Sequence, residues 1–140
     1  DDLSRLEAAA EGLEDPAAVA ALARSALAAP VVQRALAAPR HWRELAVQAE
    51  IKGRLVEGFI DLAFEDDDGR LVVIDYKTDA VVNPAAHRLQ IGAYAAALAR
   101  ATGLVVTEGW LVFAGREGTE EHRVDDLAAA VADVEALVGS

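Results

Sequence analysis

An aspartate and a lysine lie two residues apart in a short apolar stretch, Leu71-Val72-Val73-Ile74-Asp75-Tyr76-Lys77-Thr78. Its β-branched residues, preceded by an acidic turn, predict a buried strand. Because side chains alternate between the faces of a strand, Asp75 and Lys77 leave the same face, roughly 6–7 Å apart along the chain. Such a pair is either an ion pair at a strand end or part of a catalytic site, and these residues alone do not decide between the two.

A second acid, Asp61, lies in the preceding stretch, residues 54–64, which also predicts a strand. Simple alternation places Asp61 on one face with Leu55, Glu57, Phe59 and Ala63, and places Val56, Gly58, Ile60, Leu62 and Phe64 on the other. A carboxylate flanked by apolar residues is costly to bury unless it is paired or bound to a metal. Gly58 lacks a side chain near this acid, which predicts a bulge or the close approach of a ligand.

Residues 65–70, Glu-Asp-Asp-Asp-Gly-Arg, predict a turn that joins these two strands as an antiparallel hairpin. If Glu65 pairs with Leu71, Asp61 lies directly opposite Asp75, with Cβ atoms about 4.5–5.5 Å apart. Two such carboxylates repel unless a cation lies between them, and their hard oxygens suit Mg²⁺ or Mn²⁺. A slip of one residue would place Asp61 opposite Ile74 and remove this argument. We adopt the first register because it gives the two acids a physical reason to coexist.

The rest of the chain predicts one α/β domain with a mixed sheet, consistent with its 140 residues and 54% hydrophobic content. Helical patterns at 2–11, 16–29 and 31–37 form a helical cover over residues 1–40. A sheet core follows over residues 42–124, with strands at 42–50, 54–64, 71–78, 105–114 and near 120–124. A helix at 84–101 interrupts these strands, and a closing helix spans 125–138.

On the helix at 84–101, two polar side chains interrupt an otherwise apolar stripe. Gln90 and Tyr94 lie one turn apart and are therefore neighbours on that stripe, which also carries His87, Ile91 and Leu98. The pair is either a hydrogen bond at the core boundary or part of a functional site.

Charge and composition restrict the function classes. A net charge of −11 counts against a free-standing nucleic-acid binder, unless metal ions and a neighbouring basic domain supply the positive field. The absence of cysteine rules out disulfides and thiolate metal sites. No apolar run reaches the ~18 residues of a membrane span, and no signal-peptide pattern is present. The lack of cysteine suits a reducing cytosol, and we expect a cytoplasmic protein. The chain starts at Asp1 and contains no methionine, which predicts a fragment of a longer protein.

Three motifs together resemble the RecB-type branch of the PD-(D/E)XK nucleases: Gly58-Phe59-Ile60-Asp61-Leu62, Ile74-Asp75-Tyr76-Lys77-Thr78 and Gln90-Ile91-Gly92-Ala93-Tyr94. The likeness covers roughly residues 44–113 and is strongest to the C-terminal nuclease domain of AddA/RecB-type bacterial helicase–nucleases. Each motif alone is weak, but the trio in this order is fairly specific. The resemblance implies a restriction-endonuclease-like αβββαβ core, which matches the layout above.

The resemblance implies that Asp61 and Asp75 hold Mg²⁺ or Mn²⁺ together with the backbone carbonyl of Tyr76. It assigns Lys77 to orienting or activating the attacking water. Phosphodiester hydrolysis needs a cation to polarise the phosphoryl oxygen and to generate a nucleophilic hydroxide. A lysine beside the metal can stabilise the charge that develops.

By the same resemblance, Gln90 and Tyr94 position the lysine or the DNA backbone. The implied protein is an exonuclease-like deoxyribonuclease that processes DNA ends in recombinational repair in the bacterial cytoplasm. Its implied partners are DNA, a fused or associated helicase motor that uses the ATP, and a second helicase–nuclease subunit.

One departure weakens the resemblance. The family usually carries a metal-binding histidine after a Gly-x-x-x-His pattern on an early helix, and no such pattern occurs here. His41, His87 and His122 are expected at surface or boundary positions. The missing histidine either lies upstream of Asp1 or is absent, in which case metal binding is weaker. Glu44 is a candidate auxiliary acid.

Three functions therefore stay open. The first is a metal-dependent nuclease domain, which as an isolated fragment can be inactive. The second is a catalytically inactive module of nuclease fold that guides DNA or docks a partner. The third and weaker alternative is a hydrolase acting on another phosphate substrate.

Overall fold

The computed structural model describes residues 16–78, 82–115 and 118–138. The elements in chain order are α2 (Pro16–Leu27), α3 (Pro30–Ala37), β1 (His41–Ile51), β2 (Arg54–Glu65), β3 (Leu71–Lys77), the 3₁₀ turn η1 (Pro84–His87), α4 (Arg88–Thr102), β4 (Val106–Gly115), β5 (Gly118–Arg123) and α5 (Leu127–Val138). The helix predicted at 2–11 lies outside the described residues. No helix in the described ranges is long and apolar enough to cross a bilayer.

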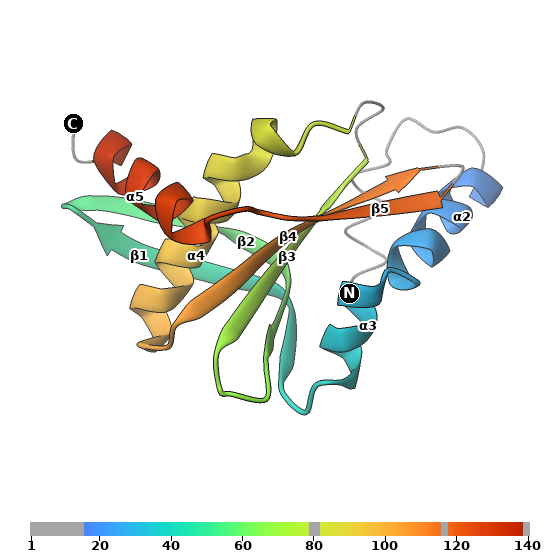
Figure 1. Cartoon of the computed structure of the whole chain (residues 1–140), viewed down its shortest axis with the longest axis horizontal. Helices are drawn as coiled ribbons and strands as arrows, with labels where there is room; N and C mark the ends of the chain where they lie inside the picture. The colour runs from blue at the N-terminus through green and yellow to red at the C-terminus, as the bar shows by residue number, and fades with distance from the viewer. Residues whose placement is uncertain (1–15, 79–81, 116–117, 139–140) are drawn as a thin grey trace.

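The five strands form one sheet in the order β1-β2-β3-β4-β5. The sheet is mixed because β3 and β4 run parallel, connected through α4, whereas the other neighbouring pairs are antiparallel. Helices α2 and α3 cover one face, and α4 and α5 cover the other (Figure 1). The predicted α/β class, with a mixed sheet between layers of helices, is therefore confirmed.

The central strand β3 supplies both cores. Val72, Ile74 and Tyr76 pack towards α2 and α3, while Leu71 and Val73 pack towards α4 and α5. This is the predicted period of two along a fully buried strand. Asp75 and Lys77 continue the second row and therefore project on the α4 side, where β3 ends.

Polar contacts from β4 and β5 hold helix α3 against the sheet. Glu121 of β5 accepts a hydrogen bond from the backbone N–H of Val31, 2.9 Å away, in the first turn of α3. A carboxylate there satisfies an otherwise unpaired donor and the positive end of the helix dipole. Arg34 of α3 also donates to both carboxylate oxygens of Glu108 in β4, at 3.1 and 3.3 Å.

The simple alternation predicted along residues 54–64 is wrong. Leu62 and Phe64 pack with α2 and α3, but Ile60 packs on the α4 side together with Ala63. Ile60 and Leu62, which alternation places on one face, therefore lie on opposite faces, and the alternation breaks next to Asp61. Phe59, predicted as an apolar neighbour of Asp61, is 53% exposed instead.

The partner strand β1 changes face at the same level. Trp42 and Leu45, three residues apart, both lie on the α4 side, and Glu44 between them has a φ of +49°. Pairing continues on both sides of this point, with Arg43 opposite Leu62 and Leu45 opposite Ile60. A positive φ is unfavourable for a residue with a side chain, so the local backbone is strained where the hairpin changes face.

Strand β2 leaves β3 beyond this point. It pairs with β3 from Glu65 to Leu62, whereas its pairing with β1 extends to Arg54. The β1–β2 hairpin therefore diverges from β3, and α4 packs against the hairpin (Figure 1). Asp61 lies at the base of this fork in the sheet.

Helix α4 differs from its prediction at its start. The first turn, predicted as α-helix from Pro84, is the 3₁₀ turn η1, and the α-helix begins at Arg88. Asn83 makes no side-chain cap, and its carbonyl accepts a hydrogen bond from the N–H of Ala86 at 3.2 Å, so the first turn closes with the i to i+3 bond of a 3₁₀ helix. The predicted stop is confirmed, because Gly103 ends α4 with a φ of +74°.

We predict that Gly92→Ala destabilises the domain although alanine favours helix. A Cβ at Gly92 would lie 2.8 Å from the backbone oxygen of Ala130 in α5, and backbone atoms cannot move aside cheaply. Helix propensity alone would stabilise by about 1 kcal/mol, so a loss of about 1–3 kcal/mol in the free energy of unfolding identifies the packing effect. Denaturant unfolding measures it. Ala93→Gly on the same helix serves as the propensity control, and a stabilised Gly92→Ala protein would contradict the prediction.

Candidate active site

Two buried carboxylates face each other at the base of the fork. The predicted pairing of Glu65 with Leu71 is confirmed, and the ladder continues to Leu62 opposite Ile74. The next step along this register places Asp61 opposite Asp75. The two residues are 3% and 4% exposed, and they are the only buried charged residues in the described part of the chain.

Asp61 is held by the backbone of the neighbouring strand. Its Oδ2 accepts a hydrogen bond of 2.8 Å from the N–H of Tyr76. That N–H lies just beyond the point where the β2–β3 ladder ends, so the carboxylate replaces the strand partner that has turned away. Sequence patterns contain no signal for this contact, because it depends on where the two strands separate.

Lys77 lies against the other acid, as the spacing predicts. Its Nζ is 2.8 Å from Oδ2 of Asp75, close enough for an ion pair. This oxygen is nevertheless buried without a partner in hydrogen-bond geometry among the described residues. The ammonium therefore offsets part of the charge of Asp75 but leaves a lone pair of its carboxylate unused.

Helix α4 fixes the lysine from the opposite side. Lys77 Nζ donates to Oε1 of Gln90 at 2.7 Å, and Nε2 of Gln90 donates to the hydroxyl of Tyr94 at 3.1 Å. Because the amide is used at both ends, its orientation is determined. The two polar residues of the stripe on α4 therefore form a relay that ends at the lysine, and through it at Asp75.

Gly58 makes room for the last member of this relay. A Cβ at this position would lie 3.0 Å from Cε1 of the Tyr94 ring. The expected bulge at Gly58 is wrong, because Gly58 pairs with Val47 in an unbroken stretch of the β1–β2 ladder, and the Tyr94 ring lies where a side chain would begin. The local irregularity of the hairpin lies instead at Glu44 and Asp61.

Burial and the facing acid both favour the protonated form of Asp75. Desolvation, followed by hydrogen bonding to and repulsion from Asp61, raises the pKa of Asp75 from 3.8 to about 7, although Lys77 opposes the shift. Burial, with the charge of Asp75 as the next cause, also raises the pKa of Tyr94. The Tyr94 hydroxyl is therefore neutral and able to accept the hydrogen bond from Gln90.

These residues fit a hard divalent cation. The ammonium of Lys77 contacts Oδ2 of Asp75 at 2.8 Å, but the raised pKa of Asp75 indicates that one positive charge does not balance two facing buried carboxylates. Oxygen ligands of this kind match Mg²⁺ and Mn²⁺ rather than softer metals. The fit is partial, since no group of three or more histidine or acidic side chains with metal-binding geometry occurs among the described residues.

The candidate auxiliary acid Glu44 lies on the far side of Asp61. The flanking pairs place it opposite Asp61 across the β1–β2 ladder, half-buried and with its strained φ. Strain of this kind concentrates at functional sites, although strain alone assigns no role.

The histidines among the described residues contact groups other than Asp61 and Asp75. The Nδ1 atom of His41 is 3.3 Å from the carbonyl oxygen of Ala38. His87 and His122 both pack against Phe113, with ring centroids 6.0 and 5.8 Å apart, and His122 also contacts Glu120. Phe113 is paired with Lys77 across the β3–β4 ladder, a neighbour of the candidate site that the sequence did not indicate.

We predict that the metal-free domain loses stability as pH rises from about 4 to 7. The folded state binds the proton of Asp75 more tightly than the unfolded state, so its contribution is complete below pH 3.8 and is lost as pH passes about 7. The loss is about 2–4 kcal/mol. Chemical unfolding in a chelator at several pH values measures it.

Asp75→Asn is expected to remove this part of the pH dependence and to be the more stable protein at pH 8. Asp125→Asn, a change at an exposed acid, is the matched control. Parallel pH profiles for wild type and Asp75→Asn would contradict the assignment.

Comparisons with known proteins identify the family of this chain. Residues 1–138 match the PD-(D/E)XK nuclease superfamily. A stretch of 63 residues is 46% identical to an ATP-dependent helicase/nuclease protein of Alkaliphilus oremlandii (strain OhILAs), covering 41% of this chain and 5% of that protein. The matched stretch is thus a small part of a much longer relative.

Solved structures share the fold. A candidate exonuclease from Eubacterium rectale superposes with a TM-score of 0.65 at 13% identity, covering 87% of this chain and 50% of that one. The protein SSO0001 superposes with a TM-score of 0.53 at 19% identity, covering 99% and 71%. At such identities the likeness concerns the fold alone, and the family match over nearly the whole chain carries the assignment. The chain belongs to the PD-(D/E)XK nuclease superfamily.

Proposed function

We propose that this domain hydrolyses DNA phosphodiester bonds with Mg²⁺ or Mn²⁺, as the nuclease part of a helicase–nuclease that processes DNA ends in recombinational repair. The observation that supports this most is the buried, facing pair of Asp61 and Asp75 with the ammonium of Lys77 at 2.8 Å. Burying two like charges is expensive, and a divalent cation between them offsets that cost.

In this proposal Asp61 and Asp75 hold the metal, and the carbonyl of Tyr76 is a further ligand. An extended residue turns its N–H and its C=O towards the same edge of the strand. Since the N–H of Tyr76 points to Asp61, its carbonyl faces the fork as well. A bound Mg²⁺ or Mn²⁺ would polarise the phosphoryl oxygen and lower the pKa of a bound water.

The residues around the metal-binding acids orient the attacking water and stabilise negative charge on the phosphate. Lys77 presents a cation beside the metal-binding acids, where it can orient the attacking water and stabilise negative charge on the phosphate. Gln90 and Tyr94 hold the lysine in place rather than leaving it free to rotate. Glu44, on the far side of Asp61, is an auxiliary acid in this scheme.

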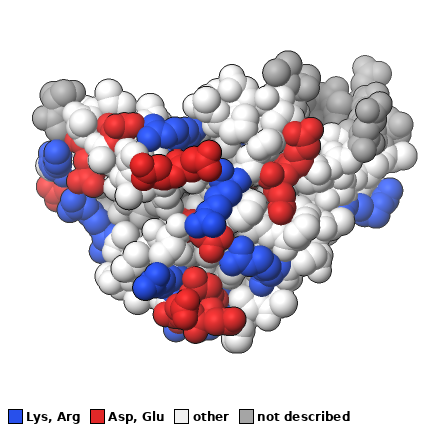
Figure 2. Space-filling view, viewed as in Figure 1, with Lys and Arg blue, Asp and Glu red and all other residues white. Residues whose placement is uncertain are grey.

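The acidity of the chain bears on how DNA reaches the site. Acidic and basic side chains are mixed over the face shown in Figure 2, without a continuous basic surface there. With a net charge of −11, phosphate contacts from this domain alone give little affinity. We propose that an associated helicase motor delivers the strand, and that a further partner is a second helicase–nuclease subunit.

A specific observation supports a second candidate, a catalytically inactive module that guides DNA or docks a partner. Only two acidic side chains meet at the candidate site among the described residues, one ligand fewer than the family usually supplies. Weak metal binding is the expected property of such a module, and calorimetric titration with Mn²⁺ separates the two candidates.

We predict Mn²⁺-dependent cleavage of linear DNA that is lost on chelation and falls at least about a hundredfold in Asp75→Asn and Lys77→Met. The first change removes a metal ligand, and the second removes the cation beside it. Glu57→Gln, an exposed acid on the same strand as Asp61, is the matched control and is expected to keep full activity. Absence of both Mn²⁺ binding and cleavage in the full-length protein would favour the inactive module.

We also predict that Tyr94→Phe lowers kcat about threefold to tenfold with little change in KM for DNA. Without the hydroxyl, the amide of Gln90 loses the partner of its Nε2 and can turn, so Lys77 is no longer held in one position. Steady-state kinetics on a short labelled duplex measure both constants. A rise in KM at unchanged kcat would instead place Tyr94 in contact with DNA.

A further inference from the structure

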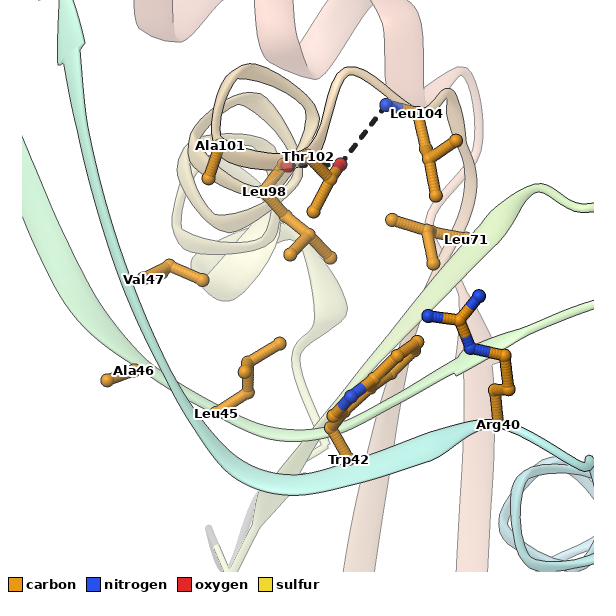
Figure 3. A pocket seen from close by; sticks show the side chains of 10 residues that line it. All are labelled: Arg40, Trp42, Leu45, Ala46, Val47, Leu71, Leu98, Ala101, Thr102 and Leu104. Carbon is orange, nitrogen blue, oxygen red and sulfur yellow. Dashed lines mark hydrogen bonds between the residues drawn. The ribbon is translucent and has the colours of Figure 1, made fainter.

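An apolar cavity of about 410 Å³ lies between β1, the start of β3 and the end of α4 (Figure 3). Its walls are mainly the side chains of Trp42, Leu45, Val47, Leu71, Leu98 and Leu104. A volume of this size is typical of sites that accept a large apolar group.

The cavity is separate from the candidate active site. Leu71 lines it at the first residue of β3, and Asp75 lies four residues further along the strand, about 13 Å away. None of the residues in the relay from Lys77 to Tyr94 lines it. Whatever occupies the cavity therefore does not touch the reacting groups.

The apolar surface continues out of the cavity. Leu104 is 39% exposed and the next residue, Val105, is 62% exposed, at the connection between α4 and β4. The hydroxyl of Thr102, also in the lining, is already used, because it donates to the carbonyl of Leu98 and accepts from the N–H of Leu104 (Figure 3). The mouth therefore offers contact area but no free hydroxyl.

An acidic turn lies directly beside this mouth. Arg40, which lines the cavity and lies over the ring of Trp42, is 3.2 Å from Glu65 at the start of the β2–β3 turn. The backbone N–H of Glu65 also donates to the carbonyl of Arg40 at 3.0 Å. Residues 65–68 are all acidic and outnumber Arg40 and Arg70, and Figure 2 shows acidic side chains gathered at this lower edge of the molecule.

We propose that the cavity and the acidic β2–β3 turn form one docking surface for a basic polypeptide segment, which inserts an apolar side chain between lysines or arginines. The acidic turn repels DNA, and a second copy of a chain with charge −11 is disfavoured for the same reason. A polypeptide is the fitting class, because the matched stretch makes up only 5% of the curated relative, so most of that relative is polypeptide outside this stretch.

The test uses the two tryptophans as reporters by NMR. The probe is the peptide Lys-Lys-Ala-Leu-Phe-Ala-Lys-Lys, added to the 15N-labelled chain at low salt. The indole N–H signal of Trp42 is expected to shift and saturate, while that of Trp110, which donates to Glu108 away from the cavity, stays unchanged. Leu104→Glu and the pair Asp67→Lys with Asp68→Lys are each expected to weaken binding about tenfold or more.

The control Asp125→Lys makes the same change of charge as either single change of the double variant, at an exposed position outside the docking surface. It is expected to leave the affinity for the peptide unaltered. The proposal is overturned if Trp42 does not respond, or if Leu104→Glu and the double variant bind like the wild type. Equal binding of a peptide with glutamates in place of the lysines would indicate an apolar ligand pocket instead. Concentration-dependent dimers in sedimentation that disappear in Leu104→Glu would indicate a second copy. The readout is binding, so its result does not depend on whether the domain cleaves DNA.

Discussion

The structure depends on keeping two carboxylates, Asp61 and Asp75, face to face and almost out of water. Without a compensating partner, the two negative charges repel each other, and the burial of each carboxylate costs the free energy of its lost hydration. In the structure the backbone N–H of Tyr76 donates to Asp61, and the ammonium of Lys77 contacts Asp75, which compensates the repulsion and the lost hydration only in part. The pKa of Asp75 stays raised even with the ammonium of Lys77 at 2.8 Å, so the charge of the pair is not fully balanced. A stable protein without a function for these acids would gain by replacing them.

The fork in the sheet creates this arrangement. A strand that stayed paired would use the N–H of Tyr76 for a neighbouring carbonyl, whereas the diverging strand leaves it for the carboxylate of Asp61. The divergence coincides with the change of face in the β1–β2 hairpin and with the positive φ of Glu44. Local strain is thus concentrated where the side chains meet, and the long hydrophobic strands on either side stabilise the whole.

The two ends of β3 differ in character. The carboxyl end carries the acids, the lysine and the relay on α4, all in well-determined contacts. The amino end opens into an apolar cavity next to an acidic turn, where large side chains contact solvent. A surface of that kind on a domain with so much negative charge favours protein neighbours over nucleic acid. In such an arrangement the docking end would hold the domain and leave the other end facing the substrate.

Much of the fold and of the candidate site could be predicted from the amino-acid sequence. Periodicity placed nearly all the strands and helices of the described ranges, because the buried β3 and the amphipathic helices have clear patterns. The turn at residues 65–70 and the requirement that Asp61 and Asp75 coexist led to the correct register, and the spacing of Gln90 and Tyr94 to a polar pair on α4. Local chemistry was sufficient there, since each inference involved neighbours within one strand, one helix or one hairpin.

Tertiary structure decided the rest. Alternation is a property of a regular strand, so it failed at Ile60, where the hairpin changes face to follow α4. Gly58 was informative only once Tyr94, from a helix 30 residues later, was seen against it. The contact of Asp61 with the Tyr76 backbone and the cavity behind Trp42 likewise require knowing which elements meet. The sequence by itself determined which groups are present and which share a strand or helix face. Only the packing of distant segments decided where strands separate, which hydrogen bonds stay open, and so where chemistry and binding are possible.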